Sequence, residues 1–192
     1  MITPKASNER KDDHHVFNQK EIKELNKKEL RFGREMVECC STLFTDFTFE
    51  DLTSADPPDE KGVYVIKVKS RSEVSPNVMI EKARQLLSSI SWNLVTEFIM
   101  SRVEYLSKIG NCPIIYIGSA GGQQGSKNTL KGRYREFSLR HTAMYPIWVL
   151  LYFNWKLEFG WKKSIRPKQE EKELKTKYRE LHNGRLPALV KR

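Results

Sequence analysis

The sequence lacks any run of about 18 apolar residues, which is the length that a membrane-spanning helix needs. Residues 1–20 are polar and charged, unlike the apolar centre of a secretory signal peptide. Internal repeats and low-complexity tracts are absent as well. These absences exclude membrane-spanning and repeat architectures, and we expect a cytoplasmic protein with no membrane partner.

Cysteine is scarce, and no CxxC pair occurs. The three cysteines are Cys39, Cys40 and Cys112, which we interpret as reduced thiols of a cytoplasmic protein. A zinc site that combines Cys39 and Cys40 with His14 and His15 is conceivable. Adjacent ligands of this kind rarely meet the tetrahedral requirement, so we do not expect zinc there.

Acidic residues are outnumbered by basic ones. The 192 residues include 34 Lys and Arg against 24 Asp and Glu, which gives a formal net charge of +10. A surplus of this size favours polyanionic partners, with nucleic acid first and an anionic membrane surface second. The hydrophobic fraction of 39% is enough for one domain with extensions.

Three short apolar runs, rich in β-branched or aromatic residues, predict strands over residues 62–69, 112–118 and 147–157. The third run is apolar enough for a central strand. Helical spacing of apolar residues predicts helices between and around these strands. The predicted helices span residues 19–43, 78–108, 129–141 and 167–182, and residues 1–18 form an arm before them. Alternating strands and helices indicate the α/β class.

Two tyrosine tripeptides lie in the first two predicted strands, Gly62-Val63-Tyr64 and Tyr116-Ile117-Gly118. The segment Leu130-Lys131-Gly132-Arg133 opens the following basic helix. The last helix carries Glu171 about a dozen residues before Asn183. Each residue alone has a plain structural explanation, as a strand tyrosine, a solvated charge or a helix end. The order and spacing of the whole set favour a functional interpretation.

In this order, the motifs resemble those of the GIY-YIG nuclease family over about residues 62–183. The resemblance implies a three-stranded antiparallel sheet flanked by helices. We expect the nuclease domain over residues 62–192, after an N-terminal arm and helical extension over residues 1–61. Family members usually join the first two strands by a short hairpin, so a helical insertion is expected at about residues 70–110.

The family resemblance also implies a role for each motif residue. Tyr64 would act as general base toward water, with positive charge nearby to lower a hydroxyl pKa of about 10. Arg133 would hold the scissile phosphate through its forked guanidinium. Glu171 would hold one divalent metal ion, Mg²⁺ or Mn²⁺. Tyr116 would orient water or metal, and Asn183 would brace the site.

One position departs from the family pattern. Many members carry His or Tyr one turn after the arginine, whereas this chain has Phe137, which cannot transfer a proton. Tyr134 and His141 lie on the same predicted helix, and His141 falls on nearly the same face as Arg133. His141 is therefore a candidate catalytic residue, with a structural role or a phosphate contact as the alternatives.

Basic residues concentrate beside the predicted site and favour double-stranded DNA as the partner. The Gly-rich segment over residues 119–129 offers polar groups for base edges, although a plain mobile loop is the alternative. The expected DNA-binding residues are Gln123, Gln124, Ser126, Lys127, Asn128, Lys131, Arg135 and Arg140.

Only a short segment follows Asn183, so we expect DNA recognition by the compact domain itself. This economy resembles the small type II restriction endonucleases of the family, which implies a homodimer, at least on DNA. The apolar stretch over residues 78–108 is the candidate dimer contact or a brace for the sheet. The alternatives are a structure-specific repair or mobile-element nuclease, and an inactive DNA-binding module of the same fold.

Overall fold

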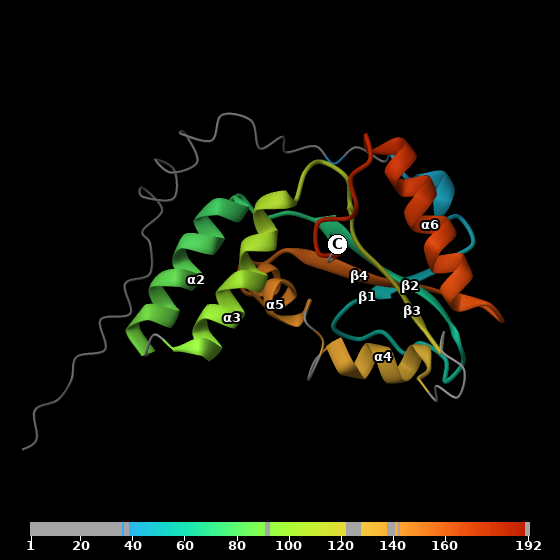
Figure 1. Ribbon diagram of the computed structural model, residues 1–192, viewed down its shortest axis with the longest axis horizontal. Coiled ribbons are helices and arrows are strands. Elements are labelled where there is room, and N and C mark those ends of the chain that lie inside the picture. The colour runs from blue at the N-terminus through green and yellow to red at the C-terminus, as the bar shows by residue number, and fades with distance from the viewer. Residues whose placement is uncertain are drawn as a thin grey trace, which may run out of the picture.

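The computed structural model describes residues 36, 39–90, 93–121, 128–137, 141 and 143–190. These residues form an α/β fold around one antiparallel sheet (Figure 1). The strand order is β1-β4-β2-β3. The strands are β1 (Thr48–Asp51), β2 (Gly62–Ser70), β3 (Ile114–Ala120) and β4 (Lys156–Lys163). The expected helices over residues 19–43 and the arm before them lie almost entirely outside the described residues.

The sheet has four strands, so the expectation of three strands is wrong. The additional strand is β1, which pairs antiparallel with β4 and contributes only four residues. Its sequence, TFED, alternates exposed and half-buried positions. A strand this short and polar carries too little hydrophobic pattern to be recognised from sequence.

The apolar run over residues 147–157 is not a strand, contrary to the sequence-based expectation. It is divided between helix α5 (Met144–Tyr152) and the start of β4. A short run that is apolar on every side is compatible with a buried helix as well as a buried strand, and its periodicity does not separate the two. In β4, the alternate residues Leu157, Phe159 and Trp161 lie in the core.

The two faces of the sheet pack against different helices. Tyr64 and Ile66 point toward a core that includes α4 (Leu130–Phe137). Val63 and Val65 point toward a second core under α6 (Pro167–Leu181) and the 3-10 turn η1 (Ser41–Leu43). Figure 1 shows α4 and α6 on opposite sides of the strands. Because successive side chains of a strand point to opposite faces, two residues that are adjacent in β2 or β3 contact different helices.

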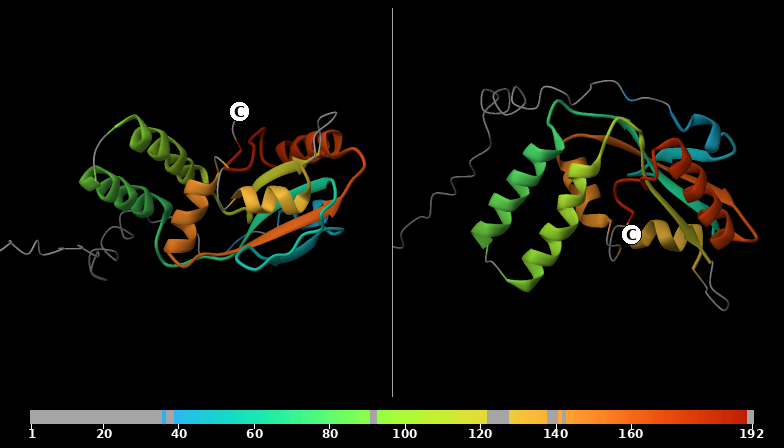
Figure 2. Two further views of the ribbon diagram at one scale, coloured as in Figure 1. Left: turned by 90° about the horizontal axis from the view of Figure 1, so that it is seen from below. Right: turned by 45° about the horizontal axis from the view of Figure 1, so that its top comes forward.

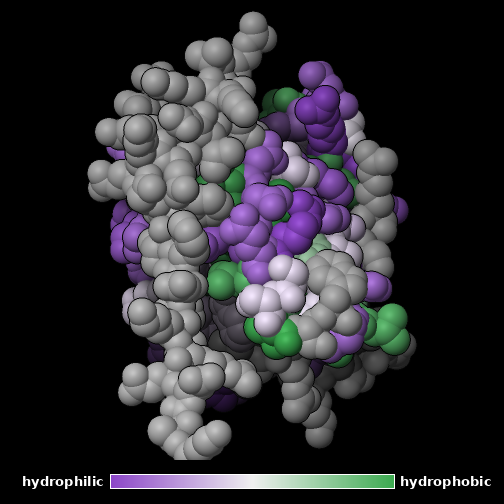
Figure 3. Space-filling view, turned by 90° about the vertical axis from the view of Figure 1, so that its left-hand side faces the viewer, coloured by the Kyte–Doolittle hydropathy of each residue, from purple (hydrophilic) through white to green (hydrophobic). Residues whose placement is uncertain are grey.

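Helices α2 (Pro76–Ile90) and α3 (Leu94–Val103) and the 3-10 turn η2 (Glu104–Lys108) lie between β2 and β3 in the chain. They group with α5 at one end of the sheet (Figure 2). Figure 3 faces this end and shows hydrophilic residues in the centre of the view with hydrophobic ones below them. The large exposed apolar residues on α2, α3 and α5 are Leu86, Ile90, Leu94, Val95, Phe98, Trp148 and Tyr152.

The contrast between a buried and an exposed isoleucine tests this core. Ile66 in β2 is 0% exposed, whereas Ile165 is 94% exposed. We expect Ile66→Ala to lower the free energy of unfolding by about 2–5 kcal/mol, because it leaves a cavity in the packed core. Ile165→Ala should change it by less than about 0.5 kcal/mol. Urea denaturation of both variants measures the difference, and equal losses would contradict the packing described here.

Candidate functional site

The two tyrosines of the tripeptides lie side by side across strands β2 and β3. Their ring centroids are 5.9 Å apart and the ring planes differ by 16°. Tyr64 is almost fully buried, at 2% exposure, whereas Tyr116 is half-buried. Phe137 contacts both rings edge-on, with centroids 5.5 Å from Tyr64 and 5.6 Å from Tyr116. Phe159 stacks on the other side of Tyr64. The phenols are therefore held in fixed positions within an aromatic group.

Gly118 explains why the second tripeptide ends in glycine. In the β2–β3 register, Tyr64 lies opposite Gly118. A Cβ atom on Gly118 would lie 2.6 Å from Cζ and Oη of Tyr64 and 2.8 Å from Cε1 of Tyr116. Contacts this short are not tolerated. The absent side chain thus makes room for the Tyr64 hydroxyl over the edge strand.

His141 lies against Phe137 and reaches Tyr116. Its ring stacks on Phe137 at 4.2 Å, and its Nε2 is 3.2 Å from the Tyr116 hydroxyl. The backbone N–H of Ala143 donates to His141 Nδ1 at 3.1 Å, so the neutral ring carries its proton on Nε2 and donates it to Tyr116. Burial, together with the charge of Arg133, lowers the pKa of His141 to about 4. The imidazole is therefore neutral near pH 7 and acts as a hydrogen-bond donor to the phenol.

Arg133 projects from α4 (Leu130–Phe137); residues 138–140 of the expected helix lie outside the described residues, and His141 is not helical. The guanidinium of Arg133 pairs with Glu136 at 2.5 Å, and its side chain is 31% exposed. Within the described part of the chain, its Nε is buried and has no hydrogen-bond partner. A bound anion can therefore contact Arg133 only through the exposed part of its side chain, since the Nε atom is covered.

Glu171 projects from the second turn of α6 toward the β3 edge, and its side chain is only 11% exposed. Ser119 and Lys168 donate to Oε2, at 2.5 and 3.1 Å, and Lys175 donates to Oε1 at 2.5 Å. Burial acts to raise the pKa of Glu171, but the hydrogen bonds from Lys175 and Ser119 outweigh it, and the pKa lies below its ordinary value. Glu171 is therefore an ionised carboxylate at neutral pH.

Arg133 and Glu171 both act electrostatically on the two phenols, from opposite faces of the sheet. Burial raises the pKa of Tyr64 well above 10, the charge of Arg133 counteracts this, and Glu171 adds to it. Burial likewise raises the pKa of Tyr116, and a hydrogen bond from Tyr64 counteracts it. Tyr64, Tyr116 and His141 thus lie together on the face that α4 covers, and the charge of Arg133 acts on both phenols from the same side, whereas Glu171 lies on the opposite face against Ser119 of β3.

Asn183 is not brought to this group. It lies beyond the C-terminal end of α6, exposed, with a left-handed backbone (φ 52°). With a helix rise of 1.5 Å per residue, the dozen residues that separate it from Glu171 span about 18 Å. Asn183 instead terminates the helix. The next residue, Gly184, also has a left-handed backbone conformation, which is common where helices end.

The structure describes three of the expected DNA-binding residues. Lys131 forms an ion pair with Asp56 at 2.8 Å, Asn128 is half-buried and Arg135 is exposed on α4. The remaining expected contacts, Gln123, Gln124, Ser126, Lys127 and Arg140, lie outside the described residues.

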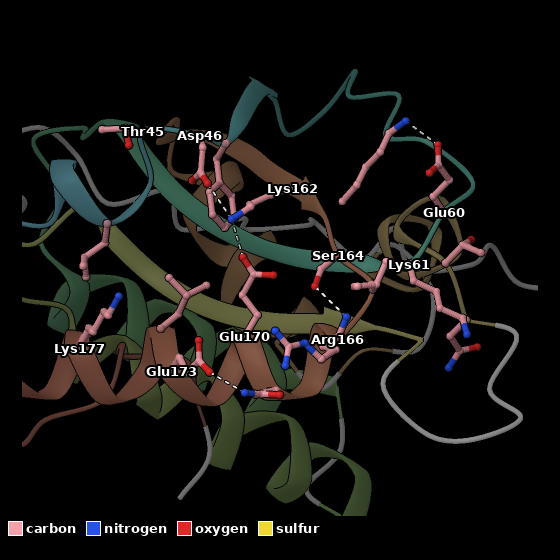
Figure 4. A pocket seen from close by; sticks show the side chains of 18 of the residues that line it. Thr45, Asp46, Glu60, Lys61, Lys162, Ser164, Arg166, Glu170, Glu173 and Lys177 are labelled. Carbon is pink, nitrogen blue, oxygen red and sulfur yellow. Dashed lines mark hydrogen bonds and ion pairs between the residues drawn. The ribbon is translucent and has the colours of Figure 1, made fainter.

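A cavity of about 1190 Å³ lies beside α6 but not at the phenols (Figure 4). It is lined by Glu170, Glu173 and Lys177 of α6 together with the segment just before β2 and the end of β4. Lys162, at its wall, pairs with Asp46 and Glu170, both at 2.7 Å. Because acidic and basic side chains are mixed in its lining, the cavity has no strong preference for an anion. We therefore place the candidate site at the β3 edge and not in this cavity.

Ser119 is a site residue that the sequence-based prediction missed. It follows the second tripeptide directly, and strand alternation turns it away from Tyr116 and Gly118 toward α6. Lys168 and Lys175 were also missed, although their spacing from Glu171 (i−3 and i+4) is a signal for contact on a helix.

The helices of the described residues are all too short or too polar to span a membrane. Comparisons of the chain with models of protein families, with curated proteins and with solved structures give no match. The functional assignment therefore depends on the geometry of the site and on the sequence motifs.

The close approach at Gly118 predicts a specific sensitivity. Gly118→Ala should destabilise the protein by about 1–3 kcal/mol, because the new methyl group overlaps both tyrosine rings. Gly110→Ala is the matched control, since a Cβ at Gly110 meets nothing within 4 Å. Urea denaturation compares the two variants, and an equally stable Gly118→Ala would show that the rings move freely.

The low pKa of His141 predicts a pH dependence of stability. In the unfolded chain, this histidine has the ordinary pKa of 6.5, so it takes up a proton at higher pH than in the folded chain, where the pKa is about 4. Its contribution to stability is therefore lost as the pH falls from about 6.5 to about 4. Unfolding of the unmodified protein and of His141→Gln across this range should show a steeper loss in the unmodified protein. Parallel curves would contradict the buried neutral imidazole.

Proposed function

We propose that this protein is a metal-dependent endonuclease of the GIY-YIG type that hydrolyses phosphodiester bonds in double-stranded DNA. The observation that carries the proposal is the stacked pair of phenols at the β3 edge, on which the charges of Arg133 and Glu171 both act. Hydrolysis of a phosphodiester needs a base for the attacking water, a positive group for the charge of the transition state, and a holder for a divalent ion. The four residues provide these three elements.

One phenol of the pair would accept the proton of the attacking water, and it can do so only after its own proton has left to solvent. In the free protein both hydroxyls are protonated, because burial raises their pKa values. Two donors, Tyr64 and His141, face the Tyr116 oxygen and favour its ionised form. We therefore assign the base function to Tyr64 and Tyr116 as one hydrogen-bonded unit, in which removal of either hydroxyl disrupts proton transfer.

Arg133 binds the scissile phosphate. The fork of its guanidinium suits bidentate contact with two phosphate oxygens, and the side chain is 31% exposed. The salt bridge to Glu136 orients the guanidinium beside the phenols. The positive charge both neutralises the transition state and lowers the pKa values of the two phenols.

Glu171 holds the divalent ion, Mg²⁺ or Mn²⁺. The donor type fits, because Mg²⁺ is commonly bound through one carboxylate together with substrate phosphates and water. When bound, the ion would stabilise negative charge on the phosphate and the leaving oxygen. Ser119 keeps the carboxylate directed at the β3 edge, and the ammonium groups of Lys168 and Lys175 balance its charge in the free protein.

The net charge of +10 supports DNA as the partner. We assign Asn128, Lys131 and Arg135, which lie at and on α4 beside Arg133, to contact with DNA near the cut. Cleavage of both strands by a protein with one site requires two copies, so we propose a homodimer on DNA, as in a type II restriction enzyme. The exposed apolar residues of α2, α3 and α5 favour that end of the molecule as the dimer contact.

Digestion of plasmid DNA tests the activity directly. Purified protein with plasmid and Mg²⁺ should give fragments of a fixed pattern, and chelation of the metal should stop the reaction. Cleavage at branched substrates only would indicate a structure-specific nuclease. Tight binding without cleavage in Mg²⁺ and in Mn²⁺ would indicate an inactive DNA-binding module and overturn the proposed activity.

Three neighbouring glutamates on α6 provide a matched comparison. We expect Glu171→Gln to reduce cleavage by about 10²-fold or more, because the metal loses its carboxylate ligand. Glu170→Gln and Glu173→Gln should retain cleavage, since these side chains contact Lys162 and Gln169 instead of the site. Initial rates of plasmid cleavage measure the effect, and DNA binding by each variant serves as the control for folding.

Substitution at the phenols and the arginine completes the test. Arg133→Ala should cost about 10²–10³-fold in rate, and Tyr64→Phe and Tyr116→Phe should each abolish most of the cleavage. Arg135→Ala on the same helix is the control, and it should weaken DNA binding without a comparable loss of rate at saturating DNA. Full activity in both Phe variants would remove the phenols from the mechanism.

A further inference from the structure

The three cysteines of the chain gather with one histidine at the C-terminal end of α6. Cys39 and Cys40 precede η1, Cys112 precedes β3, and His182 follows the last residue of α6. Their ligand atoms all lie within 4.8 Å of one another. Three segments that are distant in sequence thus present three thiols and an imidazole to one point, and this is the only such group among the described residues.

The separations within the group match a tetrahedral metal site. The Sγ atoms of Cys39 and Cys40 are 3.7 Å apart, and those of Cys40 and Cys112 are 3.5 Å apart. His182 Nε2 lies 3.2 Å from Cys39 Sγ and 3.6 Å from Cys40 Sγ. Around a tetrahedral zinc ion with Zn–S of about 2.3 Å and Zn–N of about 2.0–2.1 Å, neighbouring ligand atoms are about 3.6–3.8 Å apart. These four separations need shifts of only a few tenths of an ångström, and the remaining two, from Cys112 to Cys39 and to His182, need to close from at most 4.8 Å.

The orientation of His182 provides a second, independent observation. Its Nδ1 lies 2.7 Å from the backbone carbonyl of Tyr178, so the Nδ1–H donates there and the lone pair of Nε2 faces the thiols. The imidazole also stacks on the Tyr178 ring, with centroids 3.8 Å apart and planes within 7°. Metal-binding histidines are usually fixed in this way, by donation of the second ring N–H to a carbonyl or carboxylate. A thiol–imidazole pair of a reactive cysteine would leave the other two thiols unexplained.

We propose that Cys39, Cys40, Cys112 and His182 bind one structural Zn²⁺ ion. Three thiolates and one imidazole are a ligand set that zinc favours. With four protein ligands the coordination shell is closed, and the site is structural instead of catalytic. Adjacent cysteines argue against zinc when sequence alone is considered, but the turn at Cys39–Cys40 directs both sulfur atoms to the same point. The proposal does not depend on nuclease activity.

The ion would fasten three elements together. It would connect the segment before η1 with the start of β3 and with the end of α6, which lie side by side in Figure 1. Binding a metal only in the folded state stabilises that state. Removal of zinc is therefore expected to loosen the C-terminal half of α6 before the sheet unfolds.

Metal analysis of the full chain tests the proposal. The protein is expressed with added Zn²⁺, purified without chelator, and its zinc content is measured. We expect about one zinc per chain, and replacement by Co²⁺ should give the visible absorption of a tetrahedral thiolate complex. A chelator should remove the metal and lower the thermal midpoint of unfolding. Protein that contains no zinc and gives no cobalt spectrum, with three free thiols, would overturn the proposal.

Variants separate this site from the alternatives. Cys112→Ser and His182→Gln should each lose the bound zinc, and Cys39→Ser, at an exposed position, should lose it without loss of folding. His14→Ala combined with His15→Ala is the matched control and should retain it. A disulfide between Cys40 and Cys112 would also overturn the proposal. It would be recognised by a single remaining free thiol and by the loss of two hydrogens from the mass of the chain. Loss of plasmid cleavage alone would not bear on it, because the readout here is bound metal.

Discussion

The close approach of Tyr64 to Gly118 is the contact on which the rest of the candidate site depends. It fixes the register of β2 on β3, brings the second phenol beside the first, and places Phe137 and His141 around the pair. A shift of one residue in this register would turn every side chain of β3 to the other face. The backbone pairing of two strands thus determines which side chains meet at the edge of the sheet.

Helix α6 joins two regions with different tasks. Its second turn carries Glu171 to the edge of β3, and its C-terminal end carries His182 to the cysteines. Between them, Leu174 and Tyr178 pack into the core under the second face of the sheet. Because a helix is stiff over this length, the position of one end constrains the other.

Sequence predicts some features of this fold well and others not at all. The strands of the two tripeptides and the helix with Glu171 have strong periodic patterns, and the structure has them at the expected places. The β1 strand is too short and polar to give a signal, and the apolar run that becomes α5 has no periodicity that separates helix from strand. That Arg133 lies on one face of the sheet and Glu171 on the other follows from the packing of α4 and α6 on the strands, which single-sequence patterns do not specify.

The cysteine group shows the same limit. In the sequence, the only partners considered for Cys39 and Cys40 are His14 and His15, and zinc is not expected from that set, whereas the fold brings Cys112 and His182 to them from distant parts of the chain. Ligand sets assembled from distant segments leave no local motif. Their recognition requires the tertiary structure.

Under the proposed function, the lysine pair on Glu171 affects the order in which DNA and metal bind. Lys168 and Lys175 neutralise the carboxylate in the free protein, so a divalent ion must compete with two tethered cations. A bound phosphodiester backbone would attract either ammonium group away from Glu171. The carboxylate would then be free to bind a metal ion when the substrate arrives. Under the proposed function, nucleic acid and metal would then each strengthen the binding of the other by the same factor, since such coupling is reciprocal. The enzyme would thereby hold its ion loosely until a strand to cut lies in place.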